Sequence, residues 1–269
     1  MTLPIQTAVH GAVLLVTLNN PARRNALTPE MLCRLADVVV GFARDAALRV
    51  AVVTGAGEQA FCAGGDLART LPLMTGDRAP EDDWDRRLLA DPQVMAASGL
   101  RDFPLDKPVV AAVNGICMAA GFELLLGTDL RIASEAAIFG LPEVQRALLP
   151  FAGSMARLPQ QVPHAAAMRL LLTGEPIDAR EALRIGLVNE LHPAAEVLPA
   201  AMAVAERIAR NGPLAVRAIK RTVLESRGRP LVEAFALEDA AKREVLASAD
   251  AREGPRAFVE KRAPRYEGR

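Results

Sequence analysis

The sequence predicts an α/β fold, because strand-like apolar runs alternate with helical patterns along most of the chain. Three such runs begin at Val50, Val109 and Leu187, and each belongs to a unit of strand, glycine-containing turn and helix. No fixed period relates these units, which argues against a solenoid of identical repeats. We expect a core over residues 1–197, with ligand-binding loops at the carboxyl ends of its strands, and a helical region over residues 198–269.

The first part of the chain is predicted to contribute a hairpin, a helix and a buried strand. Two strand patterns flank the turn pair His10-Gly11. Thr28 as the N-cap and Pro29 as the first helical residue mark the start of the helix. The expected elements are strands over residues 4–9, 12–18 and 50–53 and a helix from residue 29 to about residue 45.

Residues 109–129 are the stretch around which the other elements are arranged. A buried strand over residues 109–113 leads through a small-residue turn to a helix that begins near Ala120 and stops at Gly127. The first N–H groups of that helix have no partner within it and lie at the positive end of its dipole. Glu123 lies three residues further on, and is either a catalytic base beside an oxyanion donor or an acid that only complements the dipole.

Residues 67–107 have the least regular pattern. Four acids surround Trp84, the only tryptophan, and indicate a mobile surface segment that runs into a helix near residues 86–100, or a lid over a ligand. The rest of the chain has clearer periodicity. We expect strands over residues 130–133 and 187–191, and helices over residues 164–172, 178–185, 194–210, 214–227, 231–247 and 255–262.

The composition is that of a chain with a large core and no overall electrostatic preference. It has 269 residues, 51% of them hydrophobic, and a net charge of zero, which argues against nucleic-acid or membrane binding. Residues 201–269 are locally basic, with 15 Lys and Arg against 10 Asp and Glu, which suits either a phosphate-bearing ligand or a solvated helical face. No apolar run has membrane-spanning length, no leader follows Met1, and three cysteines form no disulfide framework. We therefore expect a cytoplasmic protein.

Two loops built of alanine and glycine follow buried strands. Residues 61–66 and 114–121 allow a ligand to approach the backbone closely, and one N–H group from each would make an oxyanion hole. The plainer interpretation is that both are tight turns whose small residues serve packing. Cys62 and Cys117 flank these loops, and we interpret them as small buried apolar residues.

Glu143 supplies a second acid, because it follows Pro142 in an apolar segment where a buried charge is costly. Adding water to a conjugated thioester requires one carboxylate to activate water at the β-carbon and another to deliver a proton to the α-carbon. N–H groups would hold the enolate oxygen. Glu123 and Glu143 meet this requirement, although each could instead be a structural hydrogen-bonding residue. The scattered histidines and the lack of a nucleotide fingerprint give little support for a metal site, a Ser–His–Asp triad or a dinucleotide site.

Five motifs in order along the chain resemble the crotonase superfamily, and within it the enoyl-CoA hydratases. They are Arg24-Asn25-Ala26-Leu27, Phe61-Cys62-Ala63-Gly64-Gly65-Asp66-Leu67, Ala111-Ala112-Val113-Asn114-Gly115 through Glu123-Leu124, Phe139-Gly140-Leu141-Pro142-Glu143, and Arg252-Glu253-Gly254 with Ala257-Phe258-Val259-Glu260-Lys261-Arg262. The resemblance covers essentially the whole chain. It implies a crotonase-like spiral of ββα units with a C-terminal helical region that builds homotrimers, often paired into hexamers.

The resemblance also implies site residues. The thioester carbonyl of an acyl-CoA would lie between the N–H groups of Ala63 and Ala120, with Glu123 and Glu143 as the two acids of a hydratase. No metal or redox cofactor is implied, since coenzyme A is part of the substrate. The positions that correspond to acyl-CoA contacts are Arg24, Ala26, Ala63, Gly64, Gly65, Asp66, Leu67, Gly115, Ala120 and Pro142. Phe258 and Lys261 correspond to C-terminal positions that reach the CoA, commonly from a neighbouring subunit.

The sequence departs from the family pattern at Ala119 and Ala120, where two glycines are usual, and at Cys117, where alanine is common. The N–H of Ala120 remains, so we expect an oxyanion hole with a negative φ at this residue and a narrower acyl pocket. Three functions stay open: a hydratase, a Δ3-Δ2 enoyl-CoA isomerase, which needs only one glutamate, and a non-catalytic oligomeric scaffold or RNA-binding relative. The presence of both glutamates favours the hydratase.

Overall fold

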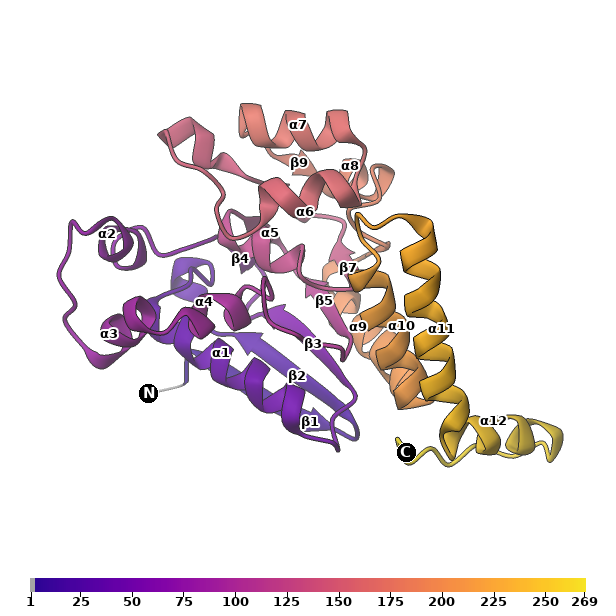
Figure 1. Cartoon of the computed structure of the whole chain (residues 1–269). Coiled ribbons are helices and arrows are strands. Elements are labelled where there is room, and N and C mark those ends of the chain that lie inside the picture. The colour runs from indigo at the N-terminus through magenta and orange to yellow at the C-terminus, as the bar shows by residue number, and fades with distance from the viewer. Residues whose placement is uncertain (1–2) are drawn as a thin grey trace.

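Six strands form the larger of two sheets in the computed structural model, which describes residues 3–269 (Figure 1). Their order is β1-β2-β3-β5-β7-β10, with β1 and β2 forming the predicted antiparallel hairpin and the other neighbours parallel. The strands are β1 (Ile5–His10), β2 (Val13–Leu18), β3 (Val50–Gly55), β5 (Val109–Val113), β7 (Leu130–Ser134) and β10 (Glu190–His192). The predicted α/β class is confirmed. The prediction that no leader follows Met1 falls partly on Met1 and Thr2, which lie outside the described residues.

The last strand begins three residues later than the sequence predicts. Leu187 and Val188 were expected to be part of it, but their N–H groups bond to the Ala182 carbonyl and complete the turn that follows α8 (Ala179–Arg184). Both side chains are buried, which explains why their apolar character suggested a strand.

A second sheet contains four short strands in the order β4-β6-β8-β9. The first three, β4 (Ala60–Cys62), β6 (Ile116–Met118) and β8 (Ile138–Gly140), each follow a strand of the larger sheet after a short turn, and β9 (Ile177–Asp178) pairs with β8. The first two lie in segments predicted to be loops, because strands of three residues show no detectable alternation. The repeated order of long strand, short strand and helix makes the expected spiral of ββα units.

A close backbone approach joins the turns before β4 and β6. A Cβ atom on Gly115 would lie 2.3 Å from the carbonyl oxygen of Gln59, so only glycine fits there. The side-chain amide of Asn114 donates to the carbonyls of Gly57 and Ala60 at 2.7 and 3.1 Å. These contacts hold the start of β4 beside the start of β6.

Helix α1 (Pro29–Arg44) begins as predicted, with the Thr28 hydroxyl accepting from the Met31 N–H at 3.2 Å. After the short α2 (Thr70–Thr75), helices α3 (Asp83–Ala90) and α4 (Pro92–Ser98) pack against α1. The prediction of one helix over residues 86–100 is wrong. Pro92 instead starts a second helix, whose N-cap Asp91 accepts from the Gln93 N–H.

The other helices surround the two sheets and extend beyond them (Figure 1). Those nearest the site are α5 (Ala120–Leu125), predicted from its N-terminus, and α6 (Ser154–Gln161), against which α7 (His164–Thr173) packs. No helix was predicted over α6, because Pro159 lies inside it. Within residues 3–269, no helix is long and apolar enough to cross a membrane.

Helix α9 (Ala194–Ala209) belongs to the core, because its Val197, Ala201 and Ala205 pack on the larger sheet beside Val110. The boundary expected at residue 198 therefore lies inside a core helix. The helices that project from the core are α10 (Pro213–Glu225), α11 (Leu231–Ala247) and α12 (Asp250–Val259) (Figure 1). None of the residues of α11 is buried.

Candidate active site

A cavity of about 190 Å³ lies where the loop after β4, the start of α5 and the segment after β8 meet. Its wall is apolar except for two acids, one arginine and one threonine. The lining residues are Leu27, Leu32, Ala63, Gly65, Leu67, Thr70, Leu71, Met74, Met95, Ala119, Ala120, Glu123, Pro142, Glu143, Arg146, Leu148, Leu149, Phe151 and Ala152. Seven of them are residues that the sequence assigned to the site: Ala63, Gly65, Leu67, Ala120, Glu123, Pro142 and Glu143.

Glu123 lies in the first turn of α5 with only 4% of its surface exposed. Its Oε1 atom accepts two hydrogen bonds from Ser154, one from the N–H at 3.2 Å and one from the hydroxyl at 3.1 Å. Burial raises the pKa of Glu123 from 4.5 to about 7, the charge of Glu143 adds to the rise, and the Ser154 hydrogen bonds oppose it. This carboxyl group therefore exchanges a proton near neutral pH.

Glu143 reaches the same cavity from a 3-10 turn, Pro142–Arg146. Burial raises the pKa of its carboxyl group. Its Oε2 atom is buried and, among the described residues, has no hydrogen-bond partner. An unpartnered buried carboxylate oxygen costs free energy in the unliganded protein, and it is available to a water molecule or a substrate.

Ser154 is a site residue that sequence reasoning missed. It is fully buried and opens α6, directly after Gly153. The one sequence signal was a glycine followed by a small hydroxyl residue, a pair typical of a helix start. Because its contact with Glu123 joins positions 31 residues apart, no local pattern indicated it.

The N–H of Ala63 is not free, which contradicts its predicted role as an oxyanion donor. It donates to the carbonyl of Arg24 at 3.0 Å. The N–H of Gly65 lines the same cavity and has no acceptor within residues 3–269. Sequence reasoning chose the wrong residue of this loop because the direction of each N–H depends on a turn that composition does not specify.

Among the described residues, the N–H of Ala120 is the second donor without an acceptor, because Ala120 is the first residue of α5. The two loops lie close together: a Cβ atom on Gly64 would lie 3.5 Å from the nitrogen of Ala120. Gly65 and Ala120 therefore offer two backbone donors at one end of the cavity that also contains both acids.

Asp66 has a structural role in this loop. It is buried, and its Oδ1 atom accepts from the N–H groups of Ala68 and Arg69 at 2.8 and 3.1 Å. Asn25, which was not predicted as a functional residue, supports the same loop from the other side. Its side-chain amide donates to the Ala60 carbonyl at 2.8 Å, and its own φ of +56° lies in the left-handed region.

The remaining predicted contacts lie outside this cavity. Gly115 packs on Gln59, whereas Phe258 and Lys261 lie at the end of α12, far from α5 (Figure 1). The predicted acyl-CoA positions that do not line the cavity are Arg24, Ala26, Gly64, Asp66, Gly115, Phe258 and Lys261. Arg24, Ala26, Gly64 and Asp66 are nevertheless in or beside the loops that form its wall.

The cysteines near the site are buried, as interpreted from the sequence. Burial raises the pKa of Cys62 to about 12 and that of Cys117 well above its ordinary value, so both remain thiols. In the described part of the chain, no group of three His, Cys, Asp or Glu side chains is arranged to hold a metal ion.

The chain belongs to the enoyl-CoA hydratase/isomerase family, whose model matches residues 8–269. It is 41% identical to the enoyl-CoA hydratase EchA19 of Mycobacterium tuberculosis over 96% of this chain and 94% of that protein. It is 37% identical to the carnitinyl-CoA dehydratase of Proteus mirabilis over the full length of both. The crystal structure of enoyl-CoA hydratase EchA1 from Mycobacterium marinum matches with a TM-score of 0.88 and 37% identity over both full chains. The protein is therefore an enzyme of this family, and the two named relatives are a hydratase and a dehydratase of CoA compounds.

The departure from the family pattern at residues 119–120 strains Ala119 and leaves Ala120 relaxed. Ala119 has φ +51° and ψ −127°, a conformation that favours glycine, whereas Ala120 begins the helix with the negative φ that was predicted.

We expect Ala119→Gly to raise the melting temperature by about 2–4 °C, because the strain of an alanine here outweighs the entropy of an added glycine. Calorimetry checks this.

The matched control is Ala120→Gly, which places glycine inside a helix at a relaxed position. It should lower the melting temperature by about 1–4 °C. A decrease of the same size in both variants would show that Ala119 is not strained.

We expect Ser154→Ala to raise the pKa of Glu123 further, because the hydroxyl stabilises its ionised form. The inflection of the pH–rate profile near pH 7 should move upward by about one unit, since the N–H donor of Ser154 remains. Ser98→Ala is the control, because Ser98 is also buried but its hydroxyl has no partner among the described residues. An unchanged inflection in Ser154→Ala would show that the hydroxyl does not tune this acid.

Proposed function

We propose that the protein is an enoyl-CoA hydratase that adds water across the 2,3-double bond of a 2-enoyl-CoA thioester. The observation that carries the proposal is the convergence of two buried acids and two free N–H groups on one cavity. Gly65 and Ala120 would hold the thioester oxygen, and Glu123 and Glu143 would exchange protons with water and substrate. Gly65 replaces Ala63 in this proposal, because the Ala63 N–H is occupied.

The reaction in this proposal balances without a metal or redox cofactor. One carboxylate takes a proton from water as the hydroxyl bonds to the β-carbon, and the electrons of the double bond move to the thioester oxygen. The N–H groups of Gly65 and Ala120 stabilise that enolate, a role in which removing one donor typically costs about 10²–10³ in rate. The other carboxyl group then delivers a proton to the α-carbon. The raised pKa of Glu123, about 7, suits it to this exchange near neutral pH, and burial raises the pKa of Glu143 in the same direction.

The cavity wall favours an apolar acyl chain. Met74, Met95 and Phe151 are among its lining residues, and Arg146 is the one basic side chain there. The positive charge of Arg146 would repel a quaternary ammonium group of the carnitinyl type. We therefore propose enoyl-CoA substrates with an apolar acyl chain, even though a carnitinyl-CoA dehydratase is among the relatives.

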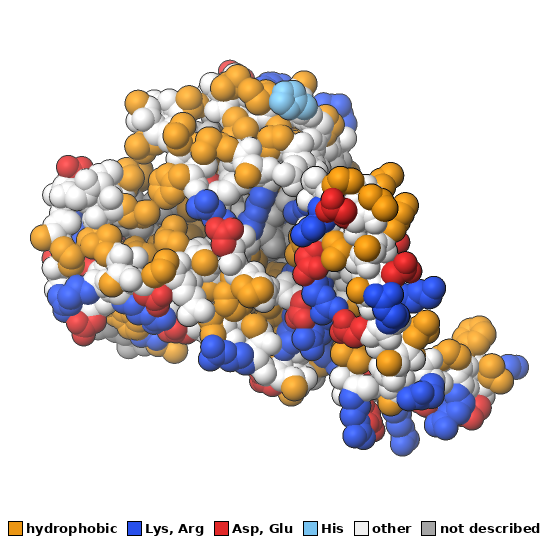
Figure 2. Space-filling model, viewed as in Figure 1, with side chains coloured by type: hydrophobic (Ala, Val, Ile, Leu, Met, Phe, Trp, Pro, Cys, Tyr) orange, Lys and Arg blue, Asp and Glu red, His pale blue; other side chains and the backbone are white. Residues whose placement is uncertain are grey.

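We propose that the projecting helices pack against other copies in a homotrimer or a pair of trimers. Val232 and Phe235 of α11 and Phe258 and Val259 of α12 are 57–85% exposed. Figure 2 shows hydrophobic side chains on these helices, where one chain leaves them uncovered. Phe258 and Lys261 would then reach the CoA of a neighbouring subunit.

The hydratase proposal is tested by Glu143→Gln with crotonyl-CoA, following loss of the ultraviolet absorbance of the conjugated thioester. We expect the rate to fall by about 10²–10⁴, because the amide cannot exchange the proton. Glu135→Gln, at an exposed glutamate, is the control and should keep full activity. Activity of Glu143→Gln within about tenfold of the parent protein would remove this residue from the mechanism. Rapid double-bond shift of a 3-enoyl-CoA without hydration would show an isomerase instead.

The oligomer proposal is tested by sedimentation equilibrium on the full chain of 28.7 kDa. We expect a mass three or six times that of the chain, because packing against other copies would bury the exposed apolar surface of α11 and α12. Phe235→Glu should lower the mass by placing a charge in the interface, whereas Glu238→Gln should not. A monomer at micromolar concentration would contradict the proposal.

A further inference from the structure

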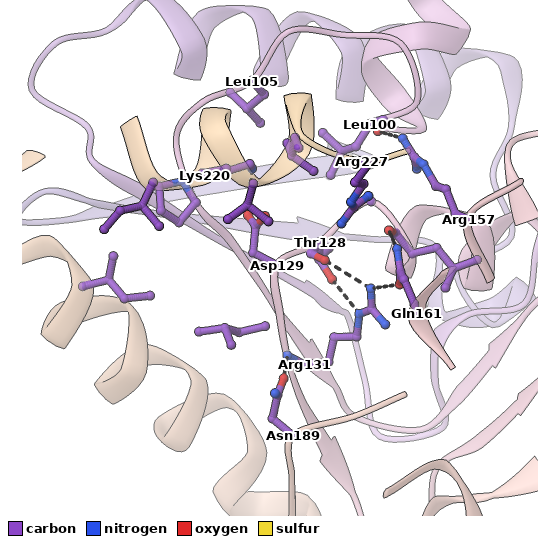
Figure 3. Close-up of a pocket in the computed structure, with 18 of the residues that line it drawn as sticks. Leu100, Leu105, Thr128, Asp129, Arg131, Arg157, Gln161, Asn189, Lys220 and Arg227 are labelled. Atoms are coloured by element: carbon purple, nitrogen blue, oxygen red, sulfur yellow. Dashed lines mark hydrogen bonds and ion pairs between the residues drawn. The ribbon is translucent and has the colours of Figure 1, made fainter. Parts of the chain in front are cut away.

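A second cavity, of about 740 Å³, lies between the core and α10 (Figure 3). It shares no lining residue with the acyl cavity in the described part of the chain. Its walls come from residues 100–108, β7, α6 and α10. The volume is within the range of about 300–1,000 Å³ that small-molecule sites occupy.

The charges that line this cavity do not balance. Five side chains are basic, Arg101, Arg131, Arg157, Lys220 and Arg227, whereas Asp129 is the one acid. Lys220 binds Asp129 at 2.7 Å, and Arg101 lies 3.4 Å from Asp102 outside the lining. Among residues 3–269, no carboxylate pairs with Arg131, Arg157 or Arg227. Figure 2 shows charged side chains where the projecting helices meet the core.

Within residues 3–269, Arg131 is a buried cation whose hydrogen bonds all go to neutral groups. It is 7% exposed, and it donates to the carbonyl of Leu187 at 3.0 Å and to the Gln161 side chain at 2.5 Å. The pKa of Arg131 is lowered to about 10, chiefly by burial; the nearby charge of Asp129 opposes this shift, and the positive charges of Arg157 and Arg227 contribute to it. Such a buried charge is costly unless an anion compensates it.

The other two cations complete a convergent set. Arg157 projects from α6 and donates to the carbonyls of Leu100 and Arg101. Arg227 follows the end of α10, and its guanidinium group makes no hydrogen bond to the described residues. In Figure 3 the side chains of Arg131, Arg157 and Arg227 come from three elements: Arg131 points toward Thr128 and Gln161, Arg227 lies on the other side of Thr128, and Arg157 is directed toward Leu100.

We propose that this cavity binds a small organic carboxylate with an apolar body, which makes it a second ligand site apart from the acyl cavity. The free guanidinium group of Arg227 would bind the carboxylate in a bidentate manner, and the charges of Arg131 and Arg157 would stabilise it. The apolar body would lie against Phe103, Leu105 and Ile219, which line the rest of the wall. Ile219 is 65% exposed, so its cover by a ligand removes apolar surface from water.

The test is thermal unfolding of the full-length protein with hexanoate, 1-hexanol or sodium chloride at equal concentration and pH 7.5. We expect about 10 mM hexanoate to raise the melting temperature by about 3 °C, and the other two additives to raise it by less than 1 °C. Arg227→Gln should abolish the hexanoate effect. Arg229→Gln should keep it, because Arg229 is exposed, pairs with Glu233 and does not line the cavity.

A hexanoate effect that survives in Arg227→Gln would place the ligand elsewhere, for example in the acyl cavity, and would overturn the proposal. An equal effect of 1-hexanol would overturn it too, because the charge would then play no part. No hexanoate effect, together with a lower mass of Arg227→Gln in sedimentation, would show that an acidic side chain of a second copy fills the cavity instead.

Discussion

The burial of two carboxyl groups beside one apolar cavity is the constraint on which the rest of the site depends. Raising the pKa of Glu123 from 4.5 to about 7 corresponds to about 3 kcal/mol of folding free energy. Because folding raises this pKa, the cost is absent below pH 4.5 and is fully present above about pH 7. Burial of Glu123 therefore lowers the folding stability at neutral pH, and it keeps this carboxyl group partly protonated there.

Three separate parts of the chain meet this constraint. The residue after β6, Ala119, starts α5 so that the Ala120 N–H has no acceptor among the described residues, and α6 brings Ser154 against Glu123. The 3-10 turn after β8 holds Glu143 with one oxygen unpartnered among the described residues. Because the two acids receive different numbers of donors, Glu123 is fixed in position while Glu143 remains open to a ligand.

The sequence predicted the larger elements and the two acids because their signals are local. Apolar runs identified β3 and β5, Thr28 and Pro29 marked the start of α1, and a charge in an apolar segment marked Glu143. The family resemblance added the spiral and the pairing of loops. These features depend on periodicity, capping or motifs, each of which lies within a few residues of the chain.

The features that the sequence did not predict depend on contacts between residues far apart along the chain, or on the direction of single peptide groups. Whether Ala63 or Gly65 presents its N–H to the cavity is decided by a hydrogen bond to Arg24, 39 positions earlier. The role of Ser154 and the basic cavity between the core and α10 likewise need residues from several elements. The sequence prediction concerned the φ of Ala120 and not that of Ala119. In the structure the positive φ falls on Ala119, which precedes the helix, and Ala120 keeps a negative φ.

The most direct measurement is a carbon-13 NMR titration of the glutamate carboxyl groups, with Glu123→Gln and Glu143→Gln used to assign the two signals. If both acids are buried at one cavity, Glu123 should titrate near pH 7 and Glu143 above pH 4.5. Titration of both groups at or below pH 4.5, as for exposed glutamates, would contradict the account.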